Sequence, residues 1–275
     1  MIDISPDAET RLAKALQAVG QGYIVVVTGA GISLASGIPT FRGNDPDAVW
    51  ARDVTELGTN RYFEQDPAGS WSWYLSRFDN VLDKQPNAAH DALVQLEQWH
   101  QGRGGEFLLV TQNVDPLHER AGTQALVKVH GSADRARCVR AGCDHAAPLG
   151  SISRQSVDLE AFRVDPVAQR LPRCPACGAL LRQHVLWFDE YYDGHADYQW
   201  SRVNDAAERA DLLLFVGTSF AVGVTNLFLQ SAMGRRIPAL SIDPSVTQTP
   251  HRWIQALPEK AEELLPNAMT QILRS

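Results

Sequence analysis

Short, unbroken runs of apolar residues recur along the chain, and segments with helical spacing of apolar positions lie between several of them. Such runs are typical of strands that are covered on both faces. They occupy residues 23–28, 107–111, 126–129, 185–188, 212–216 and 239–242. Strands that alternate with helices predict an α/β fold with a doubly wound, parallel, Rossmann-like sheet.

Helix signals support this alternation. Ser5 and Pro6, followed by Glu9, predict a helix start with a cap, a proline at the first position and an early acid. Further helical patterns cover residues 91–99 and 261–265.

Two segments break the alternation of strands and helices. Residues 43–87 are polar and aromatic with few strand signals, and residues 134–183 hold all the cysteines. We expect a helical insertion and a zinc-ribbon insertion that together form a small lobe. The main domain would then consist of residues 1–42, 88–133 and 184–275.

The helical insertion contains the sequence WSWYLSRF over residues 71–78. Tyr74 and Arg77 are three positions apart, which places both on one face of a helix. Arg77 either extends to solvent over an apolar stripe or is held inside to meet a negative group. We expect Trp71, Trp73 and Phe78 to pack the lobe.

Composition narrows the class of protein. The 275 residues are 44% hydrophobic and 21% charged, which suits a globular protein. The net charge of -7 argues against broad binding to nucleic acid. No apolar run reaches 18 residues and the acidic N-terminus lacks a basic leader, so we expect no membrane span, no export and a cytoplasmic location. A monomer is the expected state.

The four cysteines fall into two close pairs, Cys138 with Cys143 and Cys174 with Cys177. Two such pairs separated by a loop predict one tetrahedral structural zinc ion. Four thiolates leave no open position for water on the metal. The alternatives are a redox pair with two idle cysteines, or a site in which His145 replaces one ligand.

The first apolar run leads directly into the sequence TGAGIS over residues 28–33. Glycines there would let the backbone approach a phosphate, and the N-terminus of a following helix would favour its charge. The third glycine of the usual dinucleotide fingerprint is missing. A tight turn between strand and helix therefore explains this short stretch equally well.

The longer sequence GAGISLASGIPTFRG, residues 29–43, closely resembles the NAD-binding signature of the sirtuin family. TQNVDPLHERAG over 111–122, His130 with Gly131, GTS over 217–219 and the paired cysteines resemble further family motifs in the same order. The resemblance extends from about residue 22 to 265. Sirtuins are NAD-dependent protein deacylases, and some members are reported as mono-ADP-ribosyltransferases. The resemblance thus implies NAD as co-substrate and acyl-lysine proteins or peptides as partners.

The resemblance also implies roles for individual residues. His130 would be the general base, for which an imidazole is suited near neutral pH. Asn113 and Asp115 would bind the nicotinamide end and belong to the catalytic group, although an Asx turn at a strand end is the plainer interpretation. The remaining cofactor-binding residues would be Gly29, Ala30, Gly31, Ser33, Phe41, Arg42, Gln112, Gly217, Thr218, Ser219, Asp243 and Ala261. Many members carry Asn where this chain has Asp243.

Substrate residues follow from the same resemblance. Gly58, Tyr74 and Arg77 are similar to the acyl-pocket positions of the class III, or desuccinylase-type, bacterial members. A guanidinium and a phenol can hold the carboxylate of a succinyl or malonyl group. The peptide would add as a strand along Val185, Trp187, Phe188 and Glu190. The usual family form has Gly where this chain has Asp189.

The implied reaction begins with attack of the acyl oxygen on the ribose and loss of nicotinamide. His130 then promotes attack by a ribose hydroxyl, and water releases free lysine and O-acyl-ADP-ribose. We expect a desuccinylase and demalonylase with weaker deacetylase activity. The alternatives are a plain deacetylase, a protein mono-ADP-ribosyltransferase or NAD hydrolase, or a non-catalytic binding module.

Overall fold

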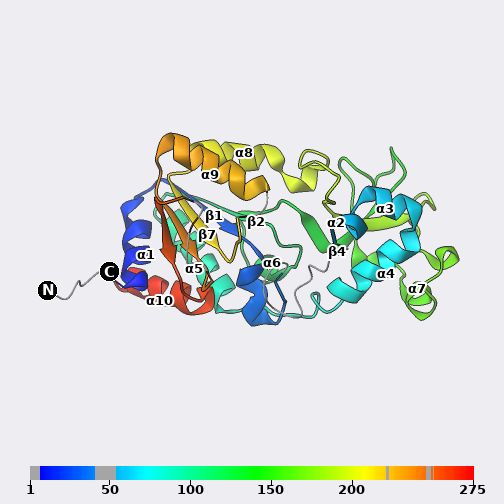
Figure 1. Cartoon of the computed structure of the whole chain (residues 1–275), viewed down its shortest axis with the longest axis horizontal. Helices are drawn as coiled ribbons and strands as arrows, with labels where there is room; N and C mark the ends of the chain where they lie inside the picture. The colour runs from blue at the N-terminus through cyan, green and yellow to red at the C-terminus, as the bar shows by residue number, and fades with distance from the viewer. Residues whose placement is uncertain (1–6, 41–53, 221–222, 246–248, 250) are drawn as a thin grey trace.

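The computed structural model describes residues 7–40, 54–220, 223–245, 249 and 251–275. Its larger part is built on a parallel sheet flanked by long helices, and a smaller lobe lies at the other end of the molecule (Figure 1). The two parts are built from different kinds of sheet.

The large sheet has six strands in the order β3-β2-β1-β7-β8-β9, and every neighbouring pair is parallel. Its strands are β1 (Tyr23–Thr28), β2 (Glu106–Thr111), β3 (Leu126–Lys128), β7 (Leu212–Val216), β8 (Ala239–Ile242) and β9 (Ile254–Leu257). The predicted doubly wound sheet is therefore confirmed. Strand β9 was not predicted, because the sequence IQAL lacks a continuous apolar run.

Successive residues of each strand face opposite helix layers, which explains the unbroken apolar runs. In β1, Ile24 and Val26 pack toward the layer formed by α1 (Ala8–Ala18), α5 (Ala88–Gly102) and α10 (Ala261–Arg274). Val25 and Val27 pack toward α8 (Trp200–Arg209) and α9 (Gly223–Arg235) on the other face. Figure 1 shows α8 and α9 on one side of the sheet and α10 on the other.

The chain runs outward from β1 in both directions. Strands β2 and β3 follow on one side, and β7, β8 and β9 follow on the other. The strand order therefore reverses between β1 and β7. In parallel sheets a ligand site forms beyond the carboxyl ends of the strands at such a reversal.

The small lobe combines a three-stranded antiparallel sheet with short helices. Its strands β4 (Gly131–Cys138), β5 (Ile152–Ser153) and β6 (Leu181–Val185) lie in the order β5-β4-β6. Its helices are α2 (Val54–Leu57), α3 (Asn60–Gln65), α4 (Pro67–Phe78) and α7 (Glu160–Val164), with 3₁₀ turns η2 (Arg154–Ser156) and η3 (Ala168–Arg170). Trp71, Tyr74, Phe78 and Trp187 share one apolar core with Cys138. The residue boundaries of the main domain and the two insertions stay a prediction.

The expectation that residues 185–188 form a strand of the main sheet is wrong. Strand β6 ends at Val185 and belongs to the small antiparallel sheet. The backbone then turns, because Phe188 N–H donates to Gly58 O at 3.0 Å and Trp187 N–H donates to the Glu190 carboxylate at 3.0 Å. These bonds replace the ladder that a continued strand would need.

One helix prediction also needs correction. Helix α1 is capped by Asp7, whose Oδ1 accepts the Thr10 N–H at 2.7 Å, so the cap is not Ser5. Ser5 and Pro6 lie outside the described residues. The helix expected after β1 is present and is of the 3₁₀ type, η1 (Ala30–Ser36). Two short elements, α6 (Leu117–Ala121) and η4 (Ala196–Tyr198), complete the set.

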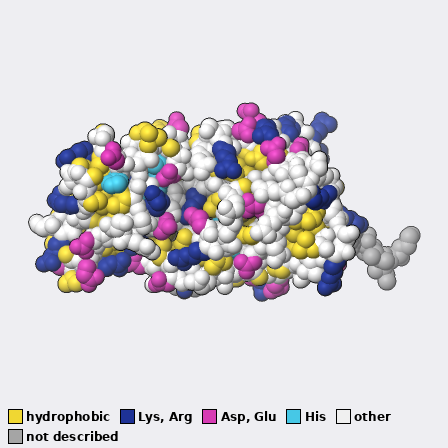
Figure 2. Space-filling view, turned by 180° about the vertical axis from the view of Figure 1, so that it is seen from behind, with side chains coloured by type: hydrophobic (Ala, Val, Ile, Leu, Met, Phe, Trp, Pro, Cys, Tyr) yellow, Lys and Arg dark blue, Asp and Glu magenta, His cyan; other side chains and the backbone are white. Residues whose placement is uncertain are grey.

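The surface is charged with both signs mixed. On the face shown in Figure 2, basic and acidic side chains are interspersed with apolar ones. Among the described residues, we find no helix with the length and apolar character that crossing a membrane requires.

Candidate functional site

A cavity of about 1000 Å³ lies at the carboxyl end of the parallel sheet and extends to the small lobe. Its wall includes most residues that the sequence nominates for cofactor and substrate. These are Gly29, Ala30, Gly31, Gly58, Tyr74, Gln112, Asn113, His130, Val185, Trp187, Phe188, Glu190, Gly217, Thr218, Ser219, Asp243 and Ala261. The structure thus brings segments separated by more than 200 residues to one concave surface.

The glycines on this wall are required by close backbone contact. A Cβ at Gly29 would lie 2.7 Å from the Gly217 carbonyl oxygen, and one at Gly31 would lie 2.6 Å from the Gly217 Cα. Gly217 itself has φ +59°, a conformation that L side chains rarely adopt. The loops after β1 and β7 can therefore meet only without side chains. Their exposed backbone then suits a phosphate ligand.

Asn113 and Asp115 form a buried network with Ser33. The Asn113 amide donates to Gly29 O and to Ser33 Oγ, both at 3.1 Å. Ser33 Oγ in turn donates to Asp115 Oδ2 at 3.0 Å. Asp115 also accepts the Leu117 N–H at 3.1 Å, which is the Asx turn considered from the sequence. Asn113 reaches the cavity wall, whereas Ser33 and Asp115 support it from behind.

His130 follows β3 and directs its imidazole to the cavity wall. Its Nδ1 lies 2.8 Å from the carbonyl oxygen of Gln112, and its Nε2 lies 3.3 Å from the hydroxyl of Tyr192. Because a carbonyl can only accept, Nδ1 carries the proton in the neutral ring. Burial lowers the pKa of His130, although the bond to Gln112 opposes this. The ring is thus held neutral with Nε2 unprotonated, as a base requires.

Two of the three acyl-pocket candidates line the cavity, and the third does not. Gly58 and Tyr74 line it, and a Cβ at Gly58 would lie 3.1 Å from the Phe188 ring. Burial raises the pKa of Tyr74, which therefore stays a phenol. Arg77 is not part of the cavity wall, but Trp73 is. The Arg77 guanidinium stacks on Trp73, 4.6 Å from the centre of its ring. The role of Arg77 stays a prediction.

The turn after β6 is fixed by an ion-pair cluster. The Glu190 carboxylate accepts from Arg182 Nη1 at 2.6 Å and from Arg137 Nη2 at 2.8 Å. Burial raises the pKa of Glu190, but the two guanidinium groups outweigh it and lower the pKa overall. Burial lowers the pKa of Arg182 to about 10, still far above neutrality. The cluster therefore remains charged and holds the turn in place.

Asp189, where the usual family form has Gly, has a clear structural partner. Its carboxylate accepts the N–H groups of Asn60 at 2.7 Å and Arg61 at 3.1 Å, at the start of α3. These are donors that a helix leaves unsatisfied. Asp189 thus connects the turn to the helical insertion.

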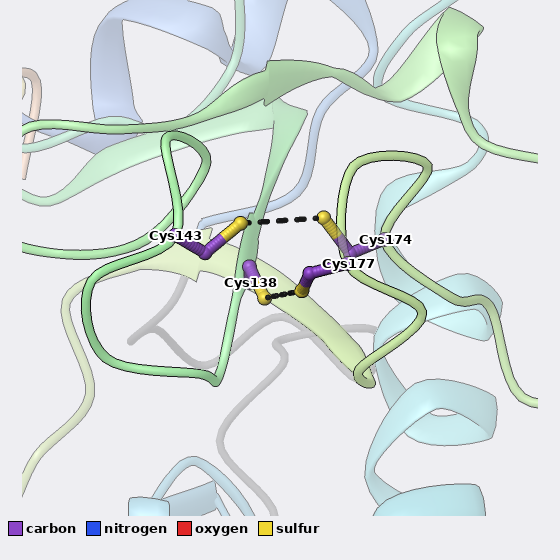
Figure 3. A group of neighbouring side chains, drawn as sticks. All are labelled: Cys138, Cys143, Cys174 and Cys177. Atoms are coloured by element: carbon purple, nitrogen blue, oxygen red, sulfur yellow. Dashed lines mark hydrogen bonds between the residues drawn. The ribbon is translucent and has the colours of Figure 1, made fainter.

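The four cysteines form a compact cluster between the end of β4 and the 174–177 loop (Figure 3). Their sulfurs approach to 3.5 Å for Cys138 and Cys177 and to 3.6 Å for Cys143 and Cys174. Four sulfurs about 2.3 Å from a tetrahedral zinc would lie roughly 3.8 Å apart, so the cluster is only slightly contracted. None of the four forms a disulfide bond. The donor set and its spacing fit one structural zinc ion.

Backbone amides favour thiolate in this cluster. Arg140 N–H donates to Cys138 Sγ at 3.3 Å. The Ala179 N–H lowers the pKa of Cys177 to about 7, while burial raises the pKa of Cys138 to about 12. A bound cation would stabilise all four thiolates. His145 is not part of the group.

A second group of possible ligands was not predicted: His184, His195 and Asp197. However, His195 Nε2 contacts Gly150 O at 3.0 Å, and its Nδ1 accepts the Asp197 N–H at 3.1 Å. Both ring nitrogens are therefore occupied by backbone. His184 Nε2 lies 3.0 Å from the Asp197 carboxylate, so the group is better described as a buried histidine paired with an exposed aspartate.

The remaining sequence predictions concern residues outside the described part of the chain and cavity residues that the sequence did not nominate. Phe41 and Arg42 lie outside the described residues. The sequence missed Tyr192, Lys260 and Glu262, which line the cavity. Tyr192 lies two positions after Glu190, the last peptide-binding candidate, but a tyrosine in a loop carries no signal of its own. Lys260 and Glu262 flank Ala261, which was nominated.

The fold and this cavity define a doubly wound α/β protein with a ligand site at the reversal of strand order. Residues 29–224 match the model of the Sir2 family. The chain is 44% identical over 200 residues to an NAD-dependent protein deacylase of Thermus thermophilus, covering 72% of this chain and 70% of that protein. It is 33% identical to the NAD-dependent protein deacylase sirtuin-5, mitochondrial, of Canis lupus familiaris, covering 84% and 76%.

A solved structure supports the same assignment. The crystal structure of a Sir2 homologue in complex with NAD superposes with a TM-score of 0.76 at 35% identity, covering 95% of this chain and 93% of that one. The chain belongs to the Sir2 family.

Proposed function

We propose that this protein is an NAD-dependent protein-lysine deacylase that prefers acyl groups ending in a carboxylate. One observation carries the proposal. A single cavity is lined by the glycine cradle, by the neutral His130 and by the small-lobe residues Gly58 and Tyr74. A dinucleotide and an acyl-lysine side chain could therefore meet beside His130.

The wall divides into regions of different chemistry. Backbone at Gly29, Gly31 and Gly217 would hold the phosphates of NAD, and Asn113 would bind its nicotinamide end. When bound, NAD would supply the ADP-ribosyl group that accepts the acyl chain. The unprotonated Nε2 of His130 would take the proton of a ribose hydroxyl.

The cysteine cluster would act at a distance. A zinc ion held by four thiolates has no free coordination position, so its role would be structural. Cys138 lies at the end of β4, whose first residue, Gly131, directly follows His130. The metal would stabilise the lobe that carries the base.

The acyl preference rests on Gly58, Tyr74 and Arg77. Gly58 packs directly against Phe188, where even a Cβ would lie only 3.1 Å from the ring, and Tyr74 offers a phenol to the cavity. Arg77 lies one helical turn beyond Tyr74 and stacks on Trp73 at the cavity wall. A guanidinium there would bind the terminal carboxylate of a succinyl or malonyl group. An acetyl group has no such carboxylate.

The test compares matched acetyl-lysine and succinyl-lysine peptides with NAD, using wild type and Arg77→Ala. Loss of a charge-assisted hydrogen bond should lower kcat/KM for the succinyl peptide roughly tenfold to a hundredfold. Deacetylation should change little. Arg61→Ala, which removes an exposed arginine of the same insertion, is the matched control and should behave as wild type.

Each failure has its own meaning. If wild type removes no acyl group from either peptide, the deacylase proposal falls. If wild type deacylates but prefers acetyl, or if Arg77→Ala keeps the succinyl preference, only the acyl preference falls. Transfer of labelled ADP-ribose onto protein without acyl loss would instead support a transferase.

A further inference from the structure

Tyr192 lies next to Nε2 of His130, the ring nitrogen that the reaction would use. Its hydroxyl lies 3.3 Å from His130 Nε2, and the two rings are nearly parallel at 22° with centres 5.8 Å apart. Nε2 is also the nitrogen left unprotonated by the Gln112 carbonyl. The Tyr192 hydroxyl is therefore the donor in this contact and Nε2 the acceptor.

Two other elements hold the tyrosine in this position. Its ring stacks on Trp200, at the start of α8, with centres 4.4 Å apart and 14° between planes. At the start of α9, a Cβ built at Gly223 would lie 3.6 Å from the hydroxyl, and the Val224 N–H interacts with the same oxygen. The hydroxyl thus lies beside the start of α9 and donates to His130.

We propose that Tyr192 is a positioning residue for His130, and that its hydroxyl fixes the imidazole as the Nδ1-protonated tautomer with its plane directed into the cavity. The Gln112 carbonyl and the Tyr192 hydroxyl hold the ring from opposite nitrogens. A ribose hydroxyl would then meet a ring already in the required tautomer and would replace the tyrosine at Nε2. This inference rests on the proposed function only for its kinetic consequence.

The environment of His130 makes the effect measurable. Beside it, Gln112 offers a carbonyl and Tyr192 a phenol, and in the described part of the chain no charged side chain is found to shift its pKa. A hydroxyl that donates to Nε2 stabilises the neutral ring. Removing it should therefore raise the pKa of His130.

The experiment uses Tyr192→Phe, which keeps the ring stack and removes only the hydroxyl. Nitrogen-15 NMR of the ligand-free protein follows the tautomer and titration of His130, with its signals assigned from their loss in His130→Gln. We expect the midpoint in Tyr192→Phe to rise by about half a pH unit, as loss of one neutral hydrogen bond implies. The share of the Nδ1-protonated tautomer should fall.

Kinetics provide the second measurement. In Tyr192→Phe we expect kcat to fall about three- to tenfold while KM for NAD and peptide stays within about twofold. Tyr191→Phe is the matched control, because Tyr191 is the neighbouring tyrosine and is 79% exposed. It should leave both the titration and kcat unchanged.

The outcomes separate this inference from the proposed function. An unchanged His130 titration and tautomer in Tyr192→Phe overturns the inference, whatever happens to kcat. The predicted titration shift without the fall in kcat also overturns it, because the ring would not need positioning. If wild type shows no deacylation, the function fails while the NMR measurement still decides whether Tyr192 sets the tautomer.

Discussion

At the residue scale, the environment of His130 determines how activity should depend on pH. Burial lowers its pKa, so the ring stays neutral to a lower pH than a free histidine. A base must be neutral, and kcat/KM should therefore fall only below an apparent pKa under about 6.5. The measurement is a pH profile of kcat/KM for an acyl peptide. An acid limb above 6.5 would assign that limb to another group.

The glycine cradle gives a second prediction at this scale. Gly31→Ala would place a methyl group 2.6 Å from the Gly217 Cα, so the loops after β1 and β7 must separate. We expect NAD binding, measured by calorimetry, to weaken at least tenfold. Gly102→Ala is the control, because a Cβ there meets nothing within 4 Å. It should leave binding intact and change stability by no more than about 1 kcal/mol. Equal NAD binding by both variants would contradict the role of these glycines in holding the phosphates.

The sequence could nominate those glycines because a residue without a side chain is itself a signal. It could also nominate His130 by resemblance to a family motif. Tyr192 gave no such signal, since its contact with His130 depends on how the turn after β6 folds back. Contacts between residues 62 positions apart follow from the fold rather than from local pattern.

At the scale of elements, the turn after β6 shows why the apolar sequence VLWF was misleading. Its apolar residues do not continue the strand, because Glu190 takes the Trp187 N–H and Gly58 takes the Phe188 N–H. Apolar content predicts burial, and Trp187 is indeed buried. Burial does not distinguish a strand from a turn packed on a core.

The ion-pair cluster at this turn predicts a marked loss of stability in Glu190→Gln. Removing one partner of a buried pair costs about 3–5 kcal/mol. Because the Glu190 side chain keeps 20% exposure, we expect a value near 3 kcal/mol. The measurement is urea unfolding at neutral pH.

Glu106→Gln is the matched control for that measurement. Glu106 pairs with Arg209 at 2.5 Å, but both side chains are about half exposed. A surface pair of this kind contributes at most about 1 kcal/mol. A loss in Glu190→Gln no larger than in the control would mean that the turn does not depend on its charges.

At the scale of the whole molecule, the large domain and the small lobe were predicted from different sequence patterns. Apolar runs predicted the parallel sheet, and paired cysteines predicted where the ribbon lies. The topology of the small sheet was beyond this reasoning, because residues 139–180, between β4 and β6, lack a regular apolar pattern in the sequence and their strand β5 has only two residues. A lobe organised by four sulfurs needs little apolar periodicity.

This division predicts that removing metal should affect the two ends of the molecule differently. Cys138 and Cys174 belong to the same apolar core as Trp71 and Trp187, whereas the parallel sheet has cores of its own. We expect purified protein to contain about one zinc per chain, and Cys177→Ala to lose it. Hydrogen exchange should then rise across β4 and β6 and stay slow in β1 and β2.

The consequence for activity follows from chain connectivity. Leu186 N–H donates to His130 O at 2.9 Å, so the end of β6 holds the backbone of the base. Loss of zinc should therefore lower kcat through a loosened His130, while NAD still binds the glycine cradle. Tyr191→Phe, exposed and outside the cluster, should keep its metal. If Cys177→Ala abolishes NAD binding as completely as turnover, the parallel sheet does not fold independently of the lobe.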